Sequence, residues 1–380
     1  MNVPYSKQAW LSIVVIAALM HSSYPAMVNA TNEGALNSQT IENKRELTPE
    51  KAGELALKQN IDLKKYQLDV DTADINANRA IYTSVKMKES NISSLGEAQQ
   101  KYVQTAKAEA ARNSHKYMLQ AMEDKTKLGG EKAFYDLWHA KQELQLKEQS
   151  LARAQKQVDM ANAFLKVGMR SKNDVMQAET GLAQAQASYE EARNQVSIST
   201  LSLNQFLAED LAKEWDLSVP KDLQDAEITP LEEAKRLAVV QRAEILKSDE
   251  ELKAAKKNVD TIEKYSILSS FQGQLAKNDL ETVEMNKEQL KNDILLEVTR
   301  NYEHLTSARK SIEALDKARE ASKENYRLTQ LRYESGLATT LDIMEAEEEL
   351  EKRENEYESA IHNYHLAFLN YDNSIGRPLS

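Results

Sequence analysis

Two short stretches of the sequence carry side-chain types that hold metal ions in other proteins. His362 and His365 lie three residues apart, a spacing at which two imidazoles on one helix can chelate a metal ion. Residues 345–351 hold five acids, and calcium binds carboxylates, but on a looped backbone. Both stretches fall in a segment whose apolar residues recur at helical spacing. The sequence therefore favours solvated helix faces at both places, and we expect no metal site.

Catalytic chemistry is equally unsupported by the residues. Gly129-Gly130 lacks the Lys and Ser/Thr that a phosphate-binding loop requires, and predicts instead a break or kink in a long helix. No nucleophile stands with a base and an orienting acid. We expect no catalytic residues, no cofactor and no enzyme activity.

Two glycines separated by 168 residues mark the most informative pattern in the chain. Gly168 is followed after six residues by Asp174, and Gly336 after six residues by Asp342. Glycine readily takes the left-handed backbone that ends many helices, so each glycine predicts a turn between two helices. Because 168 is a multiple of seven, both copies keep one heptad register.

Large apolar residues recur every seven positions before and after each turn. In the first copy they are Leu137, Leu144, Leu151, Val158 and Leu165, then Val175, Leu182, Tyr189, Val196 and Leu203. In the second copy they are Leu305, Ile312, Tyr326 and Tyr333, with Arg319 as the one polar break, then Ile343, Leu350, Tyr357, Tyr364 and Tyr371. Spacing of this kind predicts antiparallel helices that wind around each other as left-handed coiled coils.

The N-terminus indicates export. Residues 1–30 carry Lys7, an apolar run and the small-x-small pattern Val28-Asn29-Ala30, which together predict a cleaved signal peptide. We expect a polar N-terminal segment at 31–47, a first helical hairpin repeat at 48–211, a linker at 212–229 and a second helical hairpin repeat at 230–380.

The composition restricts the fold and the partners. The chain has no cysteine, so neither disulfides nor a lipidated cysteine can hold it. Its formal net charge is −11, which argues against nucleic acid as a partner. No proline lies between Pro49 and Pro220 or between Pro230 and Pro378. Long proline-free spans rich in Ala, Leu, Glu, Lys and Gln predict an all-α fold.

The paired turns resemble those of the TolC-like outer membrane efflux proteins, over about residues 48–380. The most specific parts are Val167-Gly168-Met169-Arg170-Ser171-Lys172-Asn173-Asp174-Val175-Met176 and Tyr333-Glu334-Ser335-Gly336-Leu337-Ala338-Thr339-Thr340-Leu341-Asp342-Ile343-Met344. The resemblance implies two tandem long antiparallel coiled-coil hairpins per chain, three chains forming a helical tube, and the turns at the end where a periplasmic adaptor (membrane fusion protein) and an inner-membrane pump dock.

The resemblance also implies roles for individual residues. The expected tip and adaptor-docking residues are Val167, Gly168, Met169, Ser171, Asp174, Ser335, Gly336, Leu337 and Thr340. Asp342 and Glu345 stand where the family has a ring of acids, which would form a narrow negative constriction. The alternative for Asp174 and Asp342 is that they only cap a helix and complement its dipole.

The chain departs from the family at two kinds of position. Only residues 81–94 and 265–271 could supply membrane strands, and neither segment offers two strands and a loop. We therefore expect the strands of the family's β-barrel to be reduced or absent, and membrane insertion to be doubtful. Ala338 occupies a position where some members have arginine, so closure of the tip by an arginine there is not supported.

These observations favour an exported, trimeric duct component of the cell envelope that conducts efflux substrates passively, with possible outer membrane association. The alternative is a coiled-coil scaffold of the envelope that does not conduct. A periplasmic adaptor is a third possibility, but adaptors carry β-rich domains for which this chain has no strand pattern.

Overall fold

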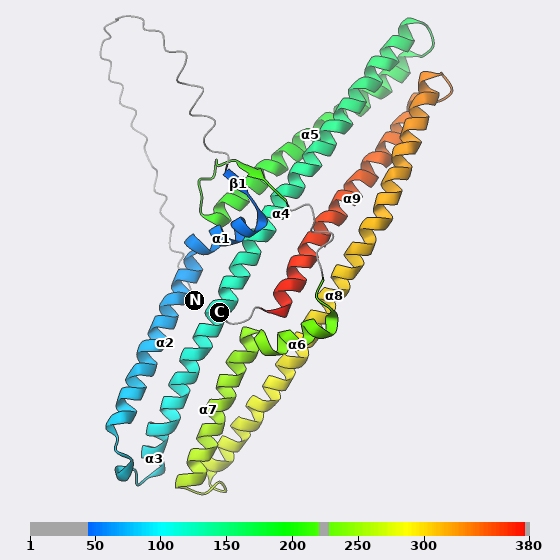
Figure 1. The fold of residues 1–380 in the computed structure, drawn as a ribbon. Helices are drawn as coiled ribbons and strands as arrows, with labels where there is room; N and C mark the ends of the chain where they lie inside the picture. Colours follow the sequence, from blue (N-terminus) through cyan, green and yellow to red (C-terminus); the bar gives the residue numbers. More distant parts are fainter. Residues whose placement is uncertain (1–44, 220–227, 377–380) are drawn as a thin grey trace, which may run out of the picture. The chain divides into compact units, whose positions relative to one another are not determined.

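The computed structural model describes residues 45–219 and 228–376, so the predicted signal peptide and residues 31–44 lie outside the described residues. In chain order the elements are β1 (Arg45–Leu47), α1 (Pro49–Gln59), α2 (Ile61–Lys86), a 3₁₀ turn (Glu89–Asn91), α3 (Leu95–Ala98), a π-helical turn (Gln99–Val103), α4 (Gln104–Lys166), α5 (Lys172–Leu207), β2 (Trp215–Leu217), α6 (Leu231–Gln241), α7 (Ala243–Tyr265), α8 (Phe271–Glu334) and α9 (Thr340–Ile375) (Figure 1). The predicted all-α class with two long helical hairpins is confirmed.

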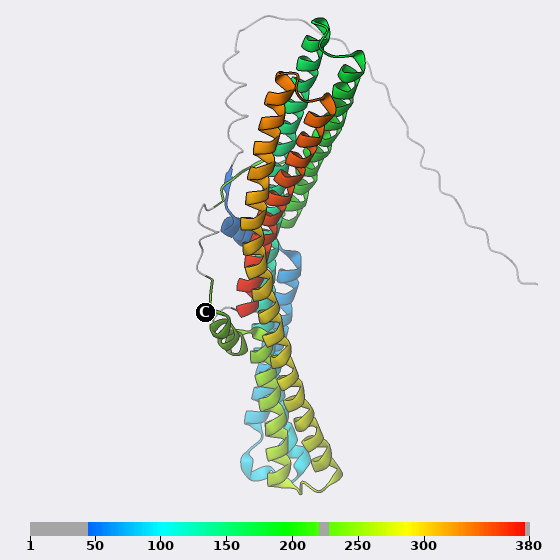
Figure 2. The same cartoon turned by 90° about the vertical axis from the view of Figure 1, so that its right-hand side faces the viewer.

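The hairpins are α4 with α5 and α8 with α9, and each second helix has 36 residues. Alongside these hairpins, α4 packs against α9. The remaining lengths of α4 and α8 pack with α2 and α7, so that α2, α4, α7 and α8 form a row in that order (Figures 1 and 2). The helices α4 and α8 therefore run through both halves of this bundle and join them.

The segments that could have supplied membrane strands hold none among the described residues. Residues 81–94 form the end of α2, the 3₁₀ turn and the residues before α3, while residues 266–270 link α7 to α8. Within the described parts of the chain, no helix is both long enough and apolar enough to cross a membrane.

A two-stranded parallel sheet anchors the start of the described chain. Leu47 of β1 and Trp215 of β2 are buried against the first hairpin, at 1% and 4% exposure. The Trp215 indole Nε1 donates to Asn204 Oδ1 at 2.6 Å, and Asn204 Nδ2 donates to the carbonyls of Leu211 and Lys213. The start of the predicted linker is thus fixed on the end of α5.

The glycine pair in α4 serves packing. The helix continues through Gly129 and Gly130 without interruption, so the predicted break is wrong. A methyl group at Gly130 would lie 2.7 Å from the Ala52 carbonyl oxygen, and one at Gly129 would meet the Phe206 ring. The absence of a side chain lets α1 and α5 lie close to α4. These partners are distant in the sequence, so the residues around the glycines do not reveal this role.

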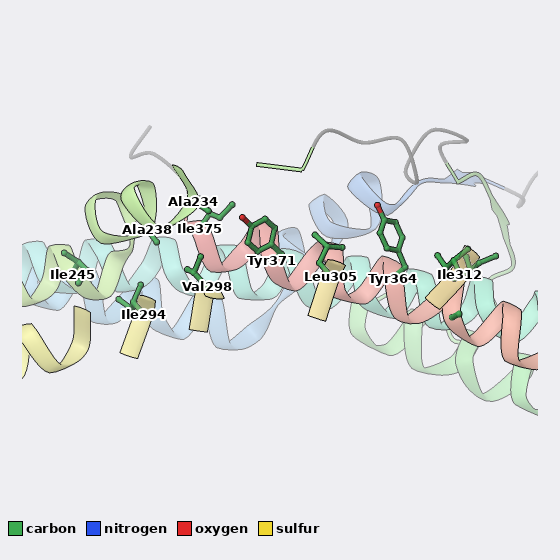
Figure 3. Close-up of a cluster of buried hydrophobic side chains, with 12 residues drawn as sticks. Ala234, Ala238, Ile245, Ile294, Val298, Leu305, Ile312, Tyr364, Tyr371 and Ile375 are labelled. Carbon is green, nitrogen blue, oxygen red and sulfur yellow. The ribbon is translucent and has the colours of Figure 1, made fainter. Parts of the chain in front are cut away.

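The core of the second hairpin repeats the predicted heptads. Leu305 and Ile312 of α8 face Tyr364 and Tyr371 of α9, and Ala234 and other residues of α6 and α7 extend the same cluster (Figure 3). The Tyr371 hydroxyl donates to the Thr229 carbonyl at 2.8 Å. Each buried aliphatic side chain of this kind contributes roughly 1.5–3 kcal/mol, so the seam is a major source of hairpin stability.

The contact between α4 and α9 joins the two hairpins and is strongly polar. The Arg153 guanidinium donates to Glu347 Oε1 at 2.7 Å and to Glu354 Oε2 at 3.0 Å. Lys147 and Ser150 donate to Glu351. The prediction that residues 345–351 form only a solvated face is therefore wrong: Glu347 is 8% exposed, because α9 has a second helical neighbour.

The histidines predicted to lie in solvent belong to the same contact. His365 is 4% exposed, with its ring centroid 4.5 Å from that of Tyr135. His362 stacks on His139 at 4.6 Å, and its Nε2 lies 3.2 Å from Asp136 Oδ1. The solvated-face prediction is wrong here too, for the same reason. Among the residues that the structure describes, no three His, Asp or Glu side chains are grouped to hold a metal ion.

Burial of His365 makes this contact sensitive to acid. Burial and the nearby His362 lower the pKa of His365 to about 4, whereas an unfolded histidine titrates near 6.5. Between these two pH values the unfolded chain binds a proton at this histidine and the folded chain does not. The contribution of His365 to stability is therefore fully present above pH 6.5 and is lost as the pH falls towards 4. His365→Phe keeps an aromatic ring but removes the titrating group. We expect the free energy of unfolding of this variant to fall by roughly 2 kcal/mol less than that of the unmodified chain between pH 7 and pH 4.5.

Urea unfolding followed by circular dichroism at both pH values measures this difference. The control is His304→Phe, because His304 is exposed on α8, outside the contact between α4 and α9, and this variant keeps His365. Equal losses in the unmodified chain and in His365→Phe would contradict the assignment.

Candidate docking and gating end

Both hairpins turn through the same backbone arrangement. Gly168 and Gly336 have φ of +78° and +73°, the left-handed conformation that favours glycine. The Met169 amide donates to the Phe164 carbonyl at 2.9 Å, and the Leu337 amide donates to the Arg332 carbonyl at 2.7 Å. These bonds satisfy carbonyls at the helix ends, so each glycine ends one helix and reverses the chain into the next.

The helices that leave the turns begin with matched capping boxes. The Asp174 carboxylate accepts from the Ser171 amide at 2.9 Å, and the Asp342 carboxylate accepts from the Thr339 amide at 2.6 Å. Hydrogen bonds from Ser171 lower the pKa of Asp174, and those from Thr339, led by its backbone amide, lower the pKa of Asp342. Both aspartates cap their helices as the sequence allowed, and both stay ionised well into the acidic range.

The two turns lie side by side at one end and are bonded to each other. The Thr340 hydroxyl donates to Asp174 Oδ1 at 3.1 Å. The Arg170 guanidinium donates to the Ala338 carbonyl and lies 4.7 Å from the centroid of the Tyr333 ring. A cation over an aromatic face contributes about 0.5–2 kcal/mol. The contact between the tips therefore combines a hydrogen bond to a carboxylate with a stacked arginine.

Sequence reasoning missed Arg170. It considered an arginine only at 338, in the second turn, whereas the structure has one in the first turn. The positions are equivalent, because 170 and 338 differ by the repeat offset of 168. Comparing the two copies for a charge present in one turn and absent from the other would have found it.

Apolar side chains support the polar contact. Phe164 of α4 meets the Tyr333 ring at 5.7 Å in an edge-on arrangement. With Met160, it packs on the cluster of Tyr333, Ile343 and their neighbours in the second hairpin. The two tips are thus held together over two helical turns rather than at a single point.

The other predicted docking residues differ in accessibility. Val167, Met169 and Leu337 are 68%, 57% and 72% exposed. Gly168, Ser171, Ser335 and Gly336 are also exposed. Thr340 is 1% exposed and serves the contact between the tips. Asp342 and Glu345 are exposed, one turn apart on α9. The tips therefore present apolar side chains next to acids.

Comparisons with known proteins bear on the fold of the chain. Residues 270–377 match the family described as outer membrane efflux protein. A comparison with curated protein sequences found no match.

Solved structures of outer membrane channels share the fold. The Campylobacter jejuni CmeC channel matches with a TM-score of 0.70 at 14% identity, over 96% of this chain and 94% of its own. The Vibrio cholerae protein VceC matches with 0.67 at 13%, over 87% and 96%, and the Neisseria gonorrhoeae MtrE channel with 0.65 at 16%, over 86% and 88%. The resemblance seen in the paired turns is confirmed.

Loss of the Arg170 contact should separate the two tips. We expect Arg170→Gln to lengthen and broaden the distance between spin labels at Val167→Cys and Leu337→Cys, two exposed positions in a chain without native cysteine. Double electron–electron resonance on labelled chains diluted with unlabelled ones measures it. Lys172→Gln, which removes an exposed neighbouring charge, should leave the distribution unchanged. Identical distance distributions in all three proteins would show that Arg170 does not hold the tips together.

Proposed function

We propose that this chain, which has the fold of the outer membrane efflux channels, is a component of an exported TolC-like duct. In this proposal three copies form a helical tube through which small molecules or proteins pass by diffusion. The observation that supports it is the pair of hairpin tips joined by hydrogen bonds at one end, combined with the family match of residues 270–377.

The tips are the proposed docking end for a periplasmic adaptor and, through it, an inner-membrane pump. Val167, Met169 and Leu337 supply exposed apolar contacts of the kind that anchor protein interfaces. A partner that binds the tips and competes for the Arg170 or Asp174 contact would shift the tips towards the open arrangement, because a ligand favours the state that it binds more tightly.

Asp342 and Glu345 are proposed to line the narrow end of the duct. Their side chains are solvent-exposed on one face of α9, and the capping bonds keep Asp342 ionised. Capping and lining are compatible roles, because the carboxylate keeps its charge while it accepts the amide hydrogen bond. Repetition around an axis would concentrate negative charge, which favours cations and repels anions.

The alternative is a coiled-coil scaffold with the same hairpins and no conducting lumen. Light scattering and planar-bilayer recording on the purified mature protein separate the proposals. A duct should form trimers and give discrete conductance steps, whereas a scaffold should give none. Monomers at every concentration would refute the tube.

Removing the acids at the narrow end should change ion selectivity. We expect Asp342→Asn with Glu345→Gln to lower the cation-to-anion permeability ratio at least twofold, because asparagine can still cap the helix but carries no charge. Reversal potentials in a salt gradient measure the ratio. The control is Asp279→Asn with Glu281→Gln, an exposed pair on α8 far from the tips. An unchanged ratio would restrict Asp342 to helix capping.

A further inference from the structure

Two turns lie side by side at the end of the bundle opposite the hairpin tips. One joins α2 to α4, and the other joins α7 to α8 (Figures 1 and 2). The Tyr102 ring of the first stacks on the Tyr265 ring beside the second, with centroids 6.2 Å apart. Both α3 and the π-helical turn contact α7. The two turns therefore form one surface, and residues 85–103 and 264–271 together make up this turn surface.

Large apolar side chains are exposed on the turn surface. Val85, in the last turn of α2, is 75% exposed, and Ile267, between α7 and α8, is 66% exposed. Phe271, the first residue of α8, is 88% exposed. Met87 and Leu268 are half-buried beside them. A single exposed apolar residue needs no explanation, but several on adjoining turns form a patch, and such patches mark binding surfaces.

Basic residues accompany the apolar ones, and acids are rare among them. Residues 75–88, 98–108 and 264–278 run into this end of the bundle or through it. These forty residues hold no aspartate or glutamate, although the chain has 60 acids in 380 residues. Their basic residues are Arg79, Lys86, Lys88, Lys101, Lys107, Lys264 and Lys277. A chain with a formal net charge of −11 thus carries positive charge at this end.

The acids nearest to the turn surface do not cancel this charge. Glu97 completes the capping box of α3, and Glu89 Oε1 accepts from the Tyr102 hydroxyl at 2.9 Å. Asp260 and Glu263 lie in the last turns of α7, where lysines at 256, 257 and 264 outnumber them. The acids are therefore either engaged in holding the first turn or balanced on their own helix.

Some of the lysines lie over aromatic rings. Lys86 Nζ lies 4.2 Å from the centroid of the Tyr82 ring, and Lys264 Nζ lies 5.4 Å from that of Tyr265. Lysine and tyrosine each join an apolar body to a polar end, so they suit a boundary between hydrocarbon and water. The hairpin tips present apolar side chains next to acids instead. The two ends of the bundle therefore fit partners of opposite charge.

We infer that the turn surface binds a membrane surface that contains anionic lipids. The lysines lie against the lipid phosphates, and Val85, Ile267 and Phe271 enter the boundary between headgroups and acyl chains. An anionic membrane surface attracts each nearby lysine, and apolar side chains are stabilised when they leave water for that boundary. The inference goes beyond the proposed duct and does not depend on assembly, because a single chain carries the whole surface.

The spacing of the apolar side chains favours lipid over an acidic protein. They come from two separate turns and from the ends of two helices, with lysines among them. Fluid lipid adapts to side chains that are spaced in this way, whereas a protein partner would need a preformed pocket for each anchor. An acidic protein is therefore an outcome of the test rather than the proposed partner.

Vesicle flotation with the full mature chain tests the role of charge. We expect the chain to float with vesicles of phosphatidylcholine mixed with phosphatidylglycerol and not with pure phosphatidylcholine, and added salt should weaken the binding. Lys88→Gln with Lys264→Gln removes one exposed charge from each turn and should weaken binding about tenfold. Lys166→Gln with Lys172→Gln, which removes two exposed charges near the first tip, should leave binding unchanged.

A fluorescent label tests the role of the apolar side chains. The chain has no native cysteine, so Phe271→Cys can carry a nitrobenzoxadiazole group, whose emission rises and shifts to the blue in apolar surroundings. We expect this change when the mixed vesicles are added. The control is the same label at Met176→Cys, which is 60% exposed near the first tip and should show no change. Circular dichroism checks that all variants stay helical.

The outcomes separate this inference from the proposed duct. Equal flotation with both kinds of vesicle, or equal losses in the two lysine pairs, would overturn it. A label at position 271 that stays in water while the chain floats would also overturn it. A chain that floats with neither kind of vesicle would overturn it in favour of an acidic protein. None of these results affects the duct, which is judged by trimers and conductance steps.

Discussion

The packing of α4 against α9 is the contact on which the rest of the structure depends. Each hairpin can form its own coiled coil from its own heptads, and this contact, together with the bonds between the tips, fixes one hairpin beside the other. It buries Glu347 with Arg153 and His365 against Tyr135. Partly buried charges cost desolvation and tolerate few alternative partners. The contact therefore adds little stability for its size but restricts the register, and that register brings Asp174 within reach of Thr340.

The sequence was sufficient for everything that local periodicity controls. Heptads such as Leu305 and Ile312 predicted the long helices, because helix faces follow directly from residue spacing. Gly168 and Gly336 predicted the turns, since the left-handed backbone is a property of the residue itself. The capping roles of Asp174 and Asp342 were likewise readable from the few residues before them.

The errors share one cause, which is a second neighbour that the spacing does not reveal. The face of α9 that looks polar within its own coiled coil packs against α4. His365 and Glu347 are buried for this reason. Gly130 looked like a helix break because the residue that requires a glycine there is distant in the sequence. That residue is Ala52, whose backbone lies too close to leave room for a side chain. Arg170 was overlooked because its acceptor, the Ala338 carbonyl, belongs to the other hairpin.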